Sequence, residues 1–438
     1  MVDLNIIIFS FNRALQLDAL IQSIWKNLSG CTYVIHIIYN ASSDELMDGY
    51  KYLQKKYTDK HDIIFLEETK GGFKGYSITD YLIIKNLKTI FHSKSVRHPK
   101  TDFRQLNIDV VRNTDSRYVV FFTDDSVLYR PCVINQKIMS FIDAAPMQNS
   151  YSMRQGLNVD DCFFCGERKG DFLEWDYSRH PVSSHWGYRF SVDGHIYSKK
   201  VIEFLISHIV FANPNTMEGP LCHYAMEKGL LRRGLSNGIS SLLSFPLNEV
   251  NTEVANFAKG VTCEMLNEKL LNGYTLEYDI PESNEAERFQ QFSSKIYFTK
   301  NGMREDYSVF DVIKHNIDVV NVDYVIDDVL CDAYKKSTEN VEYVLTLPLG
   351  YKLKEGALKQ INLKLNEFSG KKVFGIAFLL ADNKYLFHKD GEKIRYEDFD
   401  PNHVYCFKRQ DIINVINGEY RWFYGFNKCY IETTNETD

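Results

Sequence analysis

Two adjacent carboxylates, Asp124 and Asp125, follow an apolar run at residues 118–122, after Thr123, and precede Ser126. The run is rich in β-branched and aromatic residues, which predicts a buried strand. Carboxylates beside a hydroxyl, at the carboxyl end of such a strand, supply the hard oxygen ligands that Mg²⁺ or Mn²⁺ prefers. The alternative is a strand that ends in a polar turn, because Asp and Ser both favour turns.

The residues that precede this strand alternate between strand and helix patterns. Short apolar runs at 4–9, 33–39 and 63–66 predict three further strands, and apolar residues at helical spacing predict helices between them. Helical patterns at 78–91 and 103–111 then lead into the strand at 118. This order predicts a doubly wound, mostly parallel sheet flanked by helices, an α/β fold whose ligands bind at the carboxyl ends of the strands.

The bulk composition describes a globular chain of more than one domain. It has 438 residues, 44% of them hydrophobic, and a formal net charge of -7. A composition break at Ile280-Pro281 predicts a domain at 1–280 and a smaller α+β accessory domain of unknown role at 281–438. The negative charge argues against a general nucleic-acid binder, which normally carries a basic face.

The cysteines and the apolar segments indicate the cellular compartment in which we expect the protein. Nine cysteines are spread along the chain without a disulfide-like framework, which favours a reducing environment. The first residues lack a signal-peptide pattern, and no apolar stretch approaches the roughly 20 residues that cross a bilayer. We therefore expect a cytoplasmic protein without a transmembrane segment, and peripheral membrane contact stays open.

Taken together, these segments resemble the GT-A fold of nucleotide-sugar glycosyltransferases, particularly the bacterial-type, family-2-like group. Residues 6–24 look like that group's opening strand, its (S/T)(Y/F)NR turn and its first helix, and residues 40–45 are similar to its D-x-x-S-x-D segment. Residues 122–128 fall where the group places its DxD metal motif. The resemblance covers about residues 4 to 275. The sequence departs from the pattern at Asn40 and Thr123, which stand where the group usually has Asp.

The resemblance implies a donor site at the carboxyl edge of the sheet. Asp125, with Asp124 beside it, would hold Mn²⁺ or Mg²⁺ against the diphosphate of the donor. The residues expected to border the donor are Phe11, Asn12, Arg13, Asn40, Arg104 and Asp124.

The resemblance also implies acceptor and catalytic residues in the middle of the chain. Trp186 and His185 would contact the acceptor, and Asp193 would contact it or take part in catalysis. The alternative for Asp193 is a strand pair with a hairpin turn at Asp193-Gly194.

Glu218 is similar to the acidic residue that acts as catalytic base in inverting members, although Gly219 replaces the Asp that usually follows. We expect a helix to begin at Glu218, so stabilisation of the helix N-terminus is the competing explanation for this carboxylate. His223, about one turn later, is a candidate third metal ligand, and the alternative is a packed or solvated helix histidine.

The sequence thus predicts a metal-dependent glycosyltransferase that moves a sugar from a nucleotide-sugar donor, with a UDP-sugar favoured, to a hydroxyl of a glycan or glycolipid acceptor. Surface glycan or polysaccharide synthesis is the expected setting. Two alternatives remain: a sugar nucleotidyltransferase and a non-catalytic sugar-binding or scaffold protein with a degenerate GT-A domain. A nucleotidyltransferase normally has a glycine-rich loop near the N-terminus, and residues 9–14 contain no glycine. The stereochemical outcome and the oligomeric state stay open.

Overall fold

The computed structural model of the chain divides into two units, Met1–Asn256 with Val261–Tyr307, and Phe257–Gly260 with Ser308–Asp438. The predicted boundary at residue 281 falls outside the residues that the structure describes and stays a prediction. The described residues are 2–158, 164–182, 184–248, 261–278, 280, 295–308, 317–322, 329–349, 351–353, 361, 365, 375–379, 393–394, 403–410, 412, 423–424, 428–430 and 433–435.

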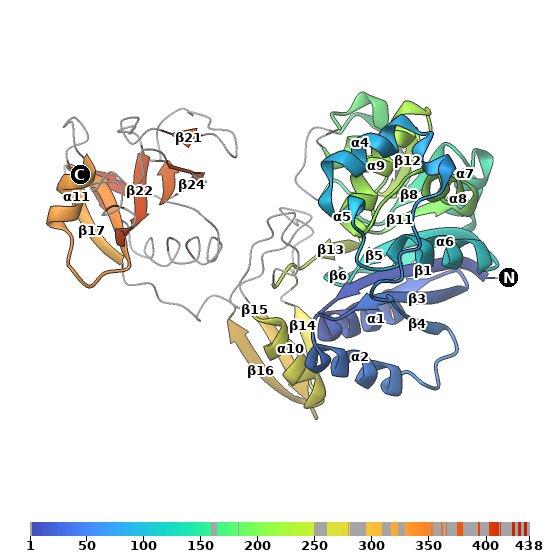
Figure 1. The fold of residues 1–438 in the computed structure, drawn as a ribbon, viewed down its shortest axis with the longest axis horizontal. Coiled ribbons are helices and arrows are strands. Elements are labelled where there is room, and N and C mark those ends of the chain that lie inside the picture. The colour runs from blue at the N-terminus through green and yellow to red at the C-terminus, as the bar shows by residue number, and fades with distance from the viewer. Residues whose placement is uncertain are drawn as a thin grey trace. The chain divides into compact units, whose positions relative to one another are not determined.

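The first unit is built around a mixed nine-stranded sheet with helices on both faces (Figure 1). The four strands at one end of the spatial order given below, β4, β3, β1 and β5, run parallel to one another, and the pairing of β5 with the next strand, β11, is antiparallel. The predicted α/β sheet flanked by helices is therefore confirmed. In spatial order the strands are β4 (Ile63–Glu67), β3 (Tyr33–Asn40), β1 (Val2–Phe11), β5 (Ser116–Thr123), β11 (His195–Ser198), β8 (Asn149–Ser152), β12 (Arg233–Asn237), β10 (Phe172–Asp176) and β9 (Gly166–Lys169).

The register between β1 and β5 positions the two aspartates. Both strands are apolar along most of their length and buried on both faces, as strands in the middle of a helix-covered parallel sheet must be. Phe9 pairs with Thr123, and the Asp124 N–H continues the ladder by donating to the Phe9 carbonyl at 3.1 Å. Because the strands are parallel, the segment after β1 and the segment after β5 leave the sheet at the same edge.

Amphipathic helices cover the two faces of this sheet. Figure 1 shows α1 and α2 on one side and α6 and α8 on the other. The core between the sheet and α6, α8 and α9 includes Phe121, Val201 and Leu205, all fully buried. The helices are α1 (Ala14–Asn27), α2 (Asp44–Lys56), α6 (Phe103–Asn113), α7 (Gln136–Ala144), α8 (Lys199–His208), α9 (Pro214–Glu227) and α10 (Cys263–Leu271).

Two helix predictions are wrong in their bounds. The single helix predicted at 78–91 is broken into α3 (Ile78–Tyr81) and α4 (Ile84–His92), followed by α5 (Lys94–Arg97). The break occurs because Ile83 has extended backbone angles, φ -92° and ψ 111°. The helix expected to begin at Glu218 begins one turn earlier at Pro214, because Asn213 caps it by accepting the Thr216 N–H at 2.9 Å.

Three small sheets complete the first unit, and β14 brings a third layer of chain against α1. No helix of the described residues is both long and apolar enough to cross a bilayer. The additional strands are the pair β2 (Leu28–Ser29) and β7 (Cys132–Val133), the pair β6 (Ser126–Leu128) and β13 (Leu242–Ser244), and the set β14 (Thr275–Tyr278), β15 (Lys295–Lys300) and β16 (Met303–Ser308).

The second unit contains a five-stranded sheet and the helix α11 (Val329–Lys336), an α+β arrangement as predicted. Sequence patterns in this region also predict a helix at 311–316 and a turn at 382–383, and both lie outside the described residues. The five strands are β17 (Ile317–Val322), β18 (Tyr343–Pro348), β22 (His403–Lys408), β20 (Gly375–Leu379) and β24 (Lys428–Tyr430), and two further pairs are β19 (Tyr351–Leu353) with β25 (Thr433–Asn435) and β21 (Lys393–Ile394) with β23 (Phe423–Tyr424).

Candidate active site

Asp124 is held from three directions at the edge where β1 and β5 end. Its Oδ2 accepts hydrogen bonds from the Ser10 hydroxyl at 2.9 Å and from the Phe11 N–H at 3.1 Å, and its Oδ1 accepts one from Arg13 at 3.1 Å. Burial raises the pKa of Asp124 to about 6, against the opposing effect of the Arg13 guanidinium. Both oxygens of Asp124 thus accept hydrogen bonds from residues at the end of β1 and in the turn that follows it.

Arg13 bridges the two aspartates. Its Nη1 lies 3.1 Å from Asp124 Oδ1 and 3.2 Å from Asp125 Oδ2, and all three side chains are buried. Its Nε donates to Asn248 Oδ1 at 2.8 Å, and its Nη2 donates to the Asn248 carbonyl. Burial by itself lowers the pKa of Arg13, but the two aspartates raise it above its ordinary value. The positively charged guanidinium of Arg13 therefore lies between the carboxylates of Asp124 and Asp125.

Thr123 links Asp125 to Asp193. The Thr123 hydroxyl oxygen lies 2.8 Å from Asp125 Oδ1 and 2.7 Å from Asp193 Oδ1. A hydroxyl has a single proton to donate, so only one of these carboxylates receives it at a time. The other oxygen of Asp193 accepts a hydrogen bond from Arg154 at 2.6 Å. The structure thus brings two of the predicted acidic residues together around one hydroxyl.

Asp193 does not sit in the turn of a hairpin. Residues 188–194 form no strand, and β11 begins only at His195. Gly194 has φ +69°, a conformation that glycine adopts without strain, and its N–H donates to the Phe121 carbonyl at 2.8 Å. This contact holds Asp193 over the end of β5.

Glu218 lies inside α9 and is bound through one of its oxygens. Its Oε1 accepts hydrogen bonds from the Ser191 hydroxyl at 2.7 Å and from the Val192 N–H at 2.9 Å. Its Oε2 accepts no hydrogen bond from the described residues. Burial, followed by the charge of Asp193, raises the pKa of Glu218 to about 7. Because α9 begins at Pro214 and its first turn contains no acidic residue, Glu218 does not cap the helix.

The polar cluster carries more negative than positive charge. With every group ionised, four carboxylates face two guanidinium groups, which leaves a formal charge of about -2. The raised pKa values of Asp124 and Glu218 follow from this excess and from burial. The acidic members are Asp124, Asp125, Asp193 and Glu218, and the basic members are Arg13 and Arg154.

A divalent cation fits this cluster in charge and in ligand type. Asp125 and Asp193 offer carboxylate oxygens around one hydroxyl, and Mg²⁺ is commonly held by one or two carboxylates together with the phosphates of a substrate. Within the described residues, no group of three or more His, Cys, Asp or Glu side chains is arranged to hold a metal ion. The protein would therefore supply a partial coordination shell, which a ligand must complete.

The segment after β3 joins the same edge of the sheet. The Asn12 amide donates to the Ser42 hydroxyl at 2.9 Å, and Asn12 Oδ1 accepts from the Ser42 N–H at 2.8 Å. Asn12 has φ +60°, a left-handed conformation that Asn tolerates better than most residues. Asn40 Oδ1 accepts the Ala41 N–H at 2.8 Å, and the Phe11 ring is 38% exposed beside this turn. Three of the predicted donor residues, Phe11, Asn12 and Asn40, thus lie together, and the Asn12 N–H donates to the Asn40 carbonyl at 3.2 Å.

Arg104, Trp186 and His223 have partners outside the polar cluster. The Arg104 guanidinium pairs with the buried Asp80 at 2.8 Å and donates to the Ile209 carbonyl at 3.1 Å, so its charge is already compensated. Trp186 is buried and packs edge-on against Trp175, with ring centroids 5.0 Å apart. His185, next to it, is exposed. His223 is exposed on α9, and its Nδ1 lies 2.9 Å from the Gly219 carbonyl of its own helix.

Tyr278 is a residue of this site that the sequence did not indicate. It ends β14, its ring packs on Phe245 at 4.4 Å between centroids, and the Phe245 N–H donates to the Asp125 carbonyl at 2.7 Å. Its hydroxyl is buried and has no hydrogen-bond partner among the described residues. Burial, followed by the charges of Asp125 and Asp124, raises the pKa of Tyr278 well above its ordinary value. No local motif marks this tyrosine, because its strand is remote in sequence from the aspartates.

Comparison with solved structures gives matches that include three of S. aureus TarS. No protein-family model and no curated protein matches the sequence. The chain is similar to the crystal structure of S. aureus TarS, with 14% identity, coverage of 55% of this chain and 36% of that chain, and a TM-score of 0.34. It is similar to TarS 1–349, with 13% identity, coverage of 55% and 60%, and a TM-score of 0.32. The values for TarS 1–349 in complex with UDP are 12% identity, coverage of 55% and 59%, and a TM-score of 0.33. The chain thus spans about a third of the first structure and about three fifths of the other two.

Proposed function

We propose that the chain is a glycosyltransferase that uses a nucleoside-diphosphate sugar as donor and a divalent cation as cofactor. The observation that carries this proposal is the hydrogen-bonded series from Asp125 through Thr123 to Asp193, which joins the end of β5 to the region of Glu218. Asp125 and Asp193 are suited to hold a phosphate-bound cation, and Glu218, whose charge interacts with that of Asp193, is suited to proton transfer. The resemblance of residues 6–24 to a glycosyltransferase opening segment supports the same function.

The donor would lie across the carboxyl edge of the parallel strands. The exposed Phe11 ring and the linked amides of Asn12 and Asn40 would border its nucleoside, since an aromatic face and amide groups suit a base and a ribose. Asp125 and Asp193 would hold Mn²⁺ or Mg²⁺. When bound, this cation neutralises charge on the departing nucleoside diphosphate. Arg13 and Asp124 would fix the orientation of Asp125, because both are hydrogen-bonded from several sides.

Glu218 would act as the general base. A carboxyl group whose pKa is about 7 is roughly half ionised at neutral pH, so the ionised form can accept a proton there and bind it well. Its Oε2 would take the proton of the acceptor hydroxyl while the acceptor oxygen bonds to the anomeric carbon and the bond from that carbon to the diphosphate breaks. The exposed His185 would border the acceptor, a glycan or a glycolipid. Trp186, which is buried, would act through packing.

A thermal-shift experiment tests this function. We expect a UDP-, GDP- or dTDP-sugar to raise the Tm only with Mn²⁺ present, because a ligand at about 100 times its Kd stabilises the folded state by roughly 2.7 kcal/mol. Asp125→Asn should abolish this shift. Asp48→Asn, which changes an exposed carboxylate on α2, is the matched control and should retain it.

Two results would count against the proposal. If no nucleotide sugar in the panel shifted the Tm of the wild-type chain, the donor class would be wrong. If Asp125→Asn responded to Mn²⁺ and donor as the wild type does, the metal assignment would be wrong. Release of pyrophosphate from a nucleoside triphosphate and a sugar phosphate would favour a nucleotidyltransferase instead.

A further inference from the structure

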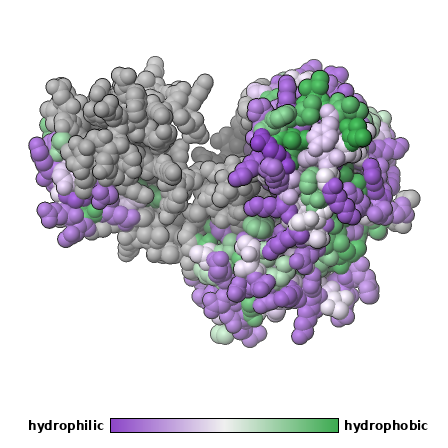
Figure 2. Space-filling model, viewed as in Figure 1, coloured by the Kyte–Doolittle hydropathy of each residue, from purple (hydrophilic) through white to green (hydrophobic). Residues whose placement is uncertain are grey.

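The segment from α3 to α5 exposes an unusual concentration of large apolar side chains. Of the thirteen exposed large hydrophobic residues in the described part of the chain, five lie between residues 78 and 91. They are Ile78, Tyr81, Leu82, Ile84 and Phe91, with exposures of 82%, 48%, 75%, 71% and 69%. In Figure 2, hydrophobic residues gather at the top of the first unit, the end where Figure 1 labels α4. Residues 78–97 are called the α3–α5 face below.

Exposure of this face is enforced by the packing of its opposite side. Asn86 is buried, and its amide donates to the Asp80 carbonyl at 2.9 Å and to the His208 carbonyl at 2.8 Å. Its Oδ1 accepts the Val210 N–H at 3.1 Å. These bonds fix the rotation of α4, so that Ile84, Lys88 and Phe91, at positions i, i+4 and i+7, share the outward stripe.

The same stretch is strongly basic in an acidic chain. Between residues 70 and 100 there are seven lysines and arginines and one acidic residue, whereas the whole chain has a net charge of -7. The acidic residue, Asp80, is buried and paired with Arg104. The basic residues are Lys70, Lys74, Lys85, Lys88, Lys94, Arg97 and Lys100.

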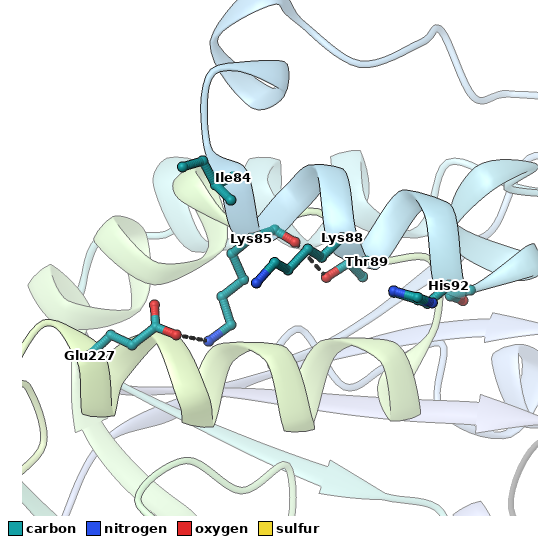
Figure 3. Close-up of a pocket in the computed structure, with 7 residues that line it drawn as sticks. Ile84, Lys85, Lys88, Thr89, His92 and Glu227 are labelled. Carbon is teal, nitrogen blue, oxygen red and sulfur yellow. Dashed lines mark hydrogen bonds and ion pairs between the residues drawn. The ribbon is translucent and has the colours of Figure 1, made fainter.

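Most of these cations are free to meet an external anion. Lys88 and Lys94 are exposed and form no ion pair with the described residues. Lys85 pairs with Glu227 of α9 at 2.8 Å. Figure 3 shows this pair at a groove of about 530 Å³ between α4 and α9, into which Lys88 projects. None of the groove residues belongs to the polar cluster around the two aspartates.

We propose that the α3–α5 face docks on the surface of an anionic lipid bilayer. A bilayer accepts both parts of this face, because apolar side chains enter the boundary of the acyl region while lysines contact lipid phosphates. Nucleic acid would match the cations but leave the five apolar side chains in water. A second copy that met this face with its own would place like charges opposite one another. The combination of charge and apolar exposure therefore favours the membrane.

Co-sedimentation of the full chain with vesicles tests the proposal. We expect binding to phosphatidylcholine vesicles that contain about one third phosphatidylglycerol, and at least roughly tenfold weaker binding to pure phosphatidylcholine. Binding should also weaken as the salt concentration rises, because salt screens the attraction between lysines and phosphates. Equal binding to both vesicle types, or none to the anionic vesicles at low salt, would overturn the proposal.

Two pairs of variants locate the contact. Lys88→Glu with Lys94→Glu should reduce binding to the anionic vesicles by roughly tenfold or more, since each cation near the surface contributes about a fivefold factor. Lys26→Glu with Lys55→Glu, which makes the same charge change at exposed lysines of α1 and α2, should not.

A further variant tests the apolar side chains of the face and combines Leu82→Ser, Ile84→Ser and Phe91→Ser. Its control combines Leu157→Ser with Met303→Ser, at exposed positions outside the face. Only the first set should release the protein from anionic vesicles. Equal losses in the face and control variants would refute the location. Concentration-dependent self-association that disappears with the serine variants of the face, without vesicle binding by the wild type, would identify a second copy as the occupant instead.

Discussion

Replacing Glu218 by glutamine should stabilise the first unit at about pH 8 and leave its stability nearly unchanged at about pH 4. Glutamine keeps the oxygen that accepts hydrogen bonds from Ser191 and Val192 and has nearly the same volume. It cannot ionise. The substitution therefore removes the buried charge at high pH while retaining the contacts of the side chain.

The magnitude follows from the pKa of this carboxyl group. Burial, followed by the charge of Asp193, raises the pKa of Glu218 from 4.5 to about 7. The folded chain then binds the proton more tightly than the unfolded chain, so the stabilising contribution is complete below about pH 4.5 and is lost as the pH rises through about 7. At about 1.4 kcal/mol for each pKa unit, the loss is roughly 3 kcal/mol. This corresponds to several degrees in the Tm of a unit of this size.

The assay is thermal unfolding of the wild type and Glu218→Gln between about pH 4 and pH 8. The two Tm curves should meet at the acid end and separate above about pH 5, with the variant higher. Glu203→Gln, a change at a partly exposed glutamate of α8 that lies 3.6 Å from Lys199, is the control and should follow the wild type. Parallel curves for Glu218→Gln and the wild type would refute the raised pKa and, with it, the argument for a base poised near neutral pH.

Two further substitutions test the surroundings of the aspartates. Arg13→Gln should lower the free energy of unfolding by roughly 3–5 kcal/mol in urea titrations, because it leaves the buried Asp124 and Asp125 without their shared cation; a loss below about 1 kcal/mol would mean that the guanidinium is not their main partner. Tyr278→Phe should change that free energy by less than about 1 kcal/mol, because the hydroxyl has no hydrogen-bond partner among the described residues.

The parallel half of the sheet was predictable because its signal is local. The apolar runs at β1 and β5 are continuous, as strands covered by helices on both faces require, and polar residues stop both of them. The runs at β3 and at the edge strand β4 are shorter but also end at polar residues. Once these strands are parallel, their carboxyl ends meet at one edge, and the proximity of Arg13 to Asp124 follows. Helix bounds were less predictable. Asn213 caps α9 five residues before Glu218, and one extended residue, Ile83, divides the helix expected at 78–91.

The remainder of the site depends on contacts between distant segments. Arg13 meets Asn248, a separation of 235 positions, and no periodicity reports such a pairing. The resemblance implied an acceptor contact for Trp186, but its indole is buried, and Trp175 Nε1 donates to the Trp186 backbone carbonyl at 3.0 Å. Arg104 lies near the aspartates in sequence, yet its guanidinium pairs with Asp80 of α3 at 2.8 Å, a partner that no local pattern indicates.

Thr123 is the clearest departure of the sequence from the DxD pattern, and the structure suggests how the site accommodates it. A threonine here removes one carboxylate from the end of β5. Its hydroxyl, however, lies between Asp125 and Asp193, at 2.8 and 2.7 Å, and so brings in a carboxylate from 70 positions later in the chain. Arg154 binds the far oxygen of Asp193 and leaves the near oxygen directed at Thr123. The acidic groups beside Thr123 therefore come from positions 125 and 193, and under the proposed function these two carboxylates would hold the cation.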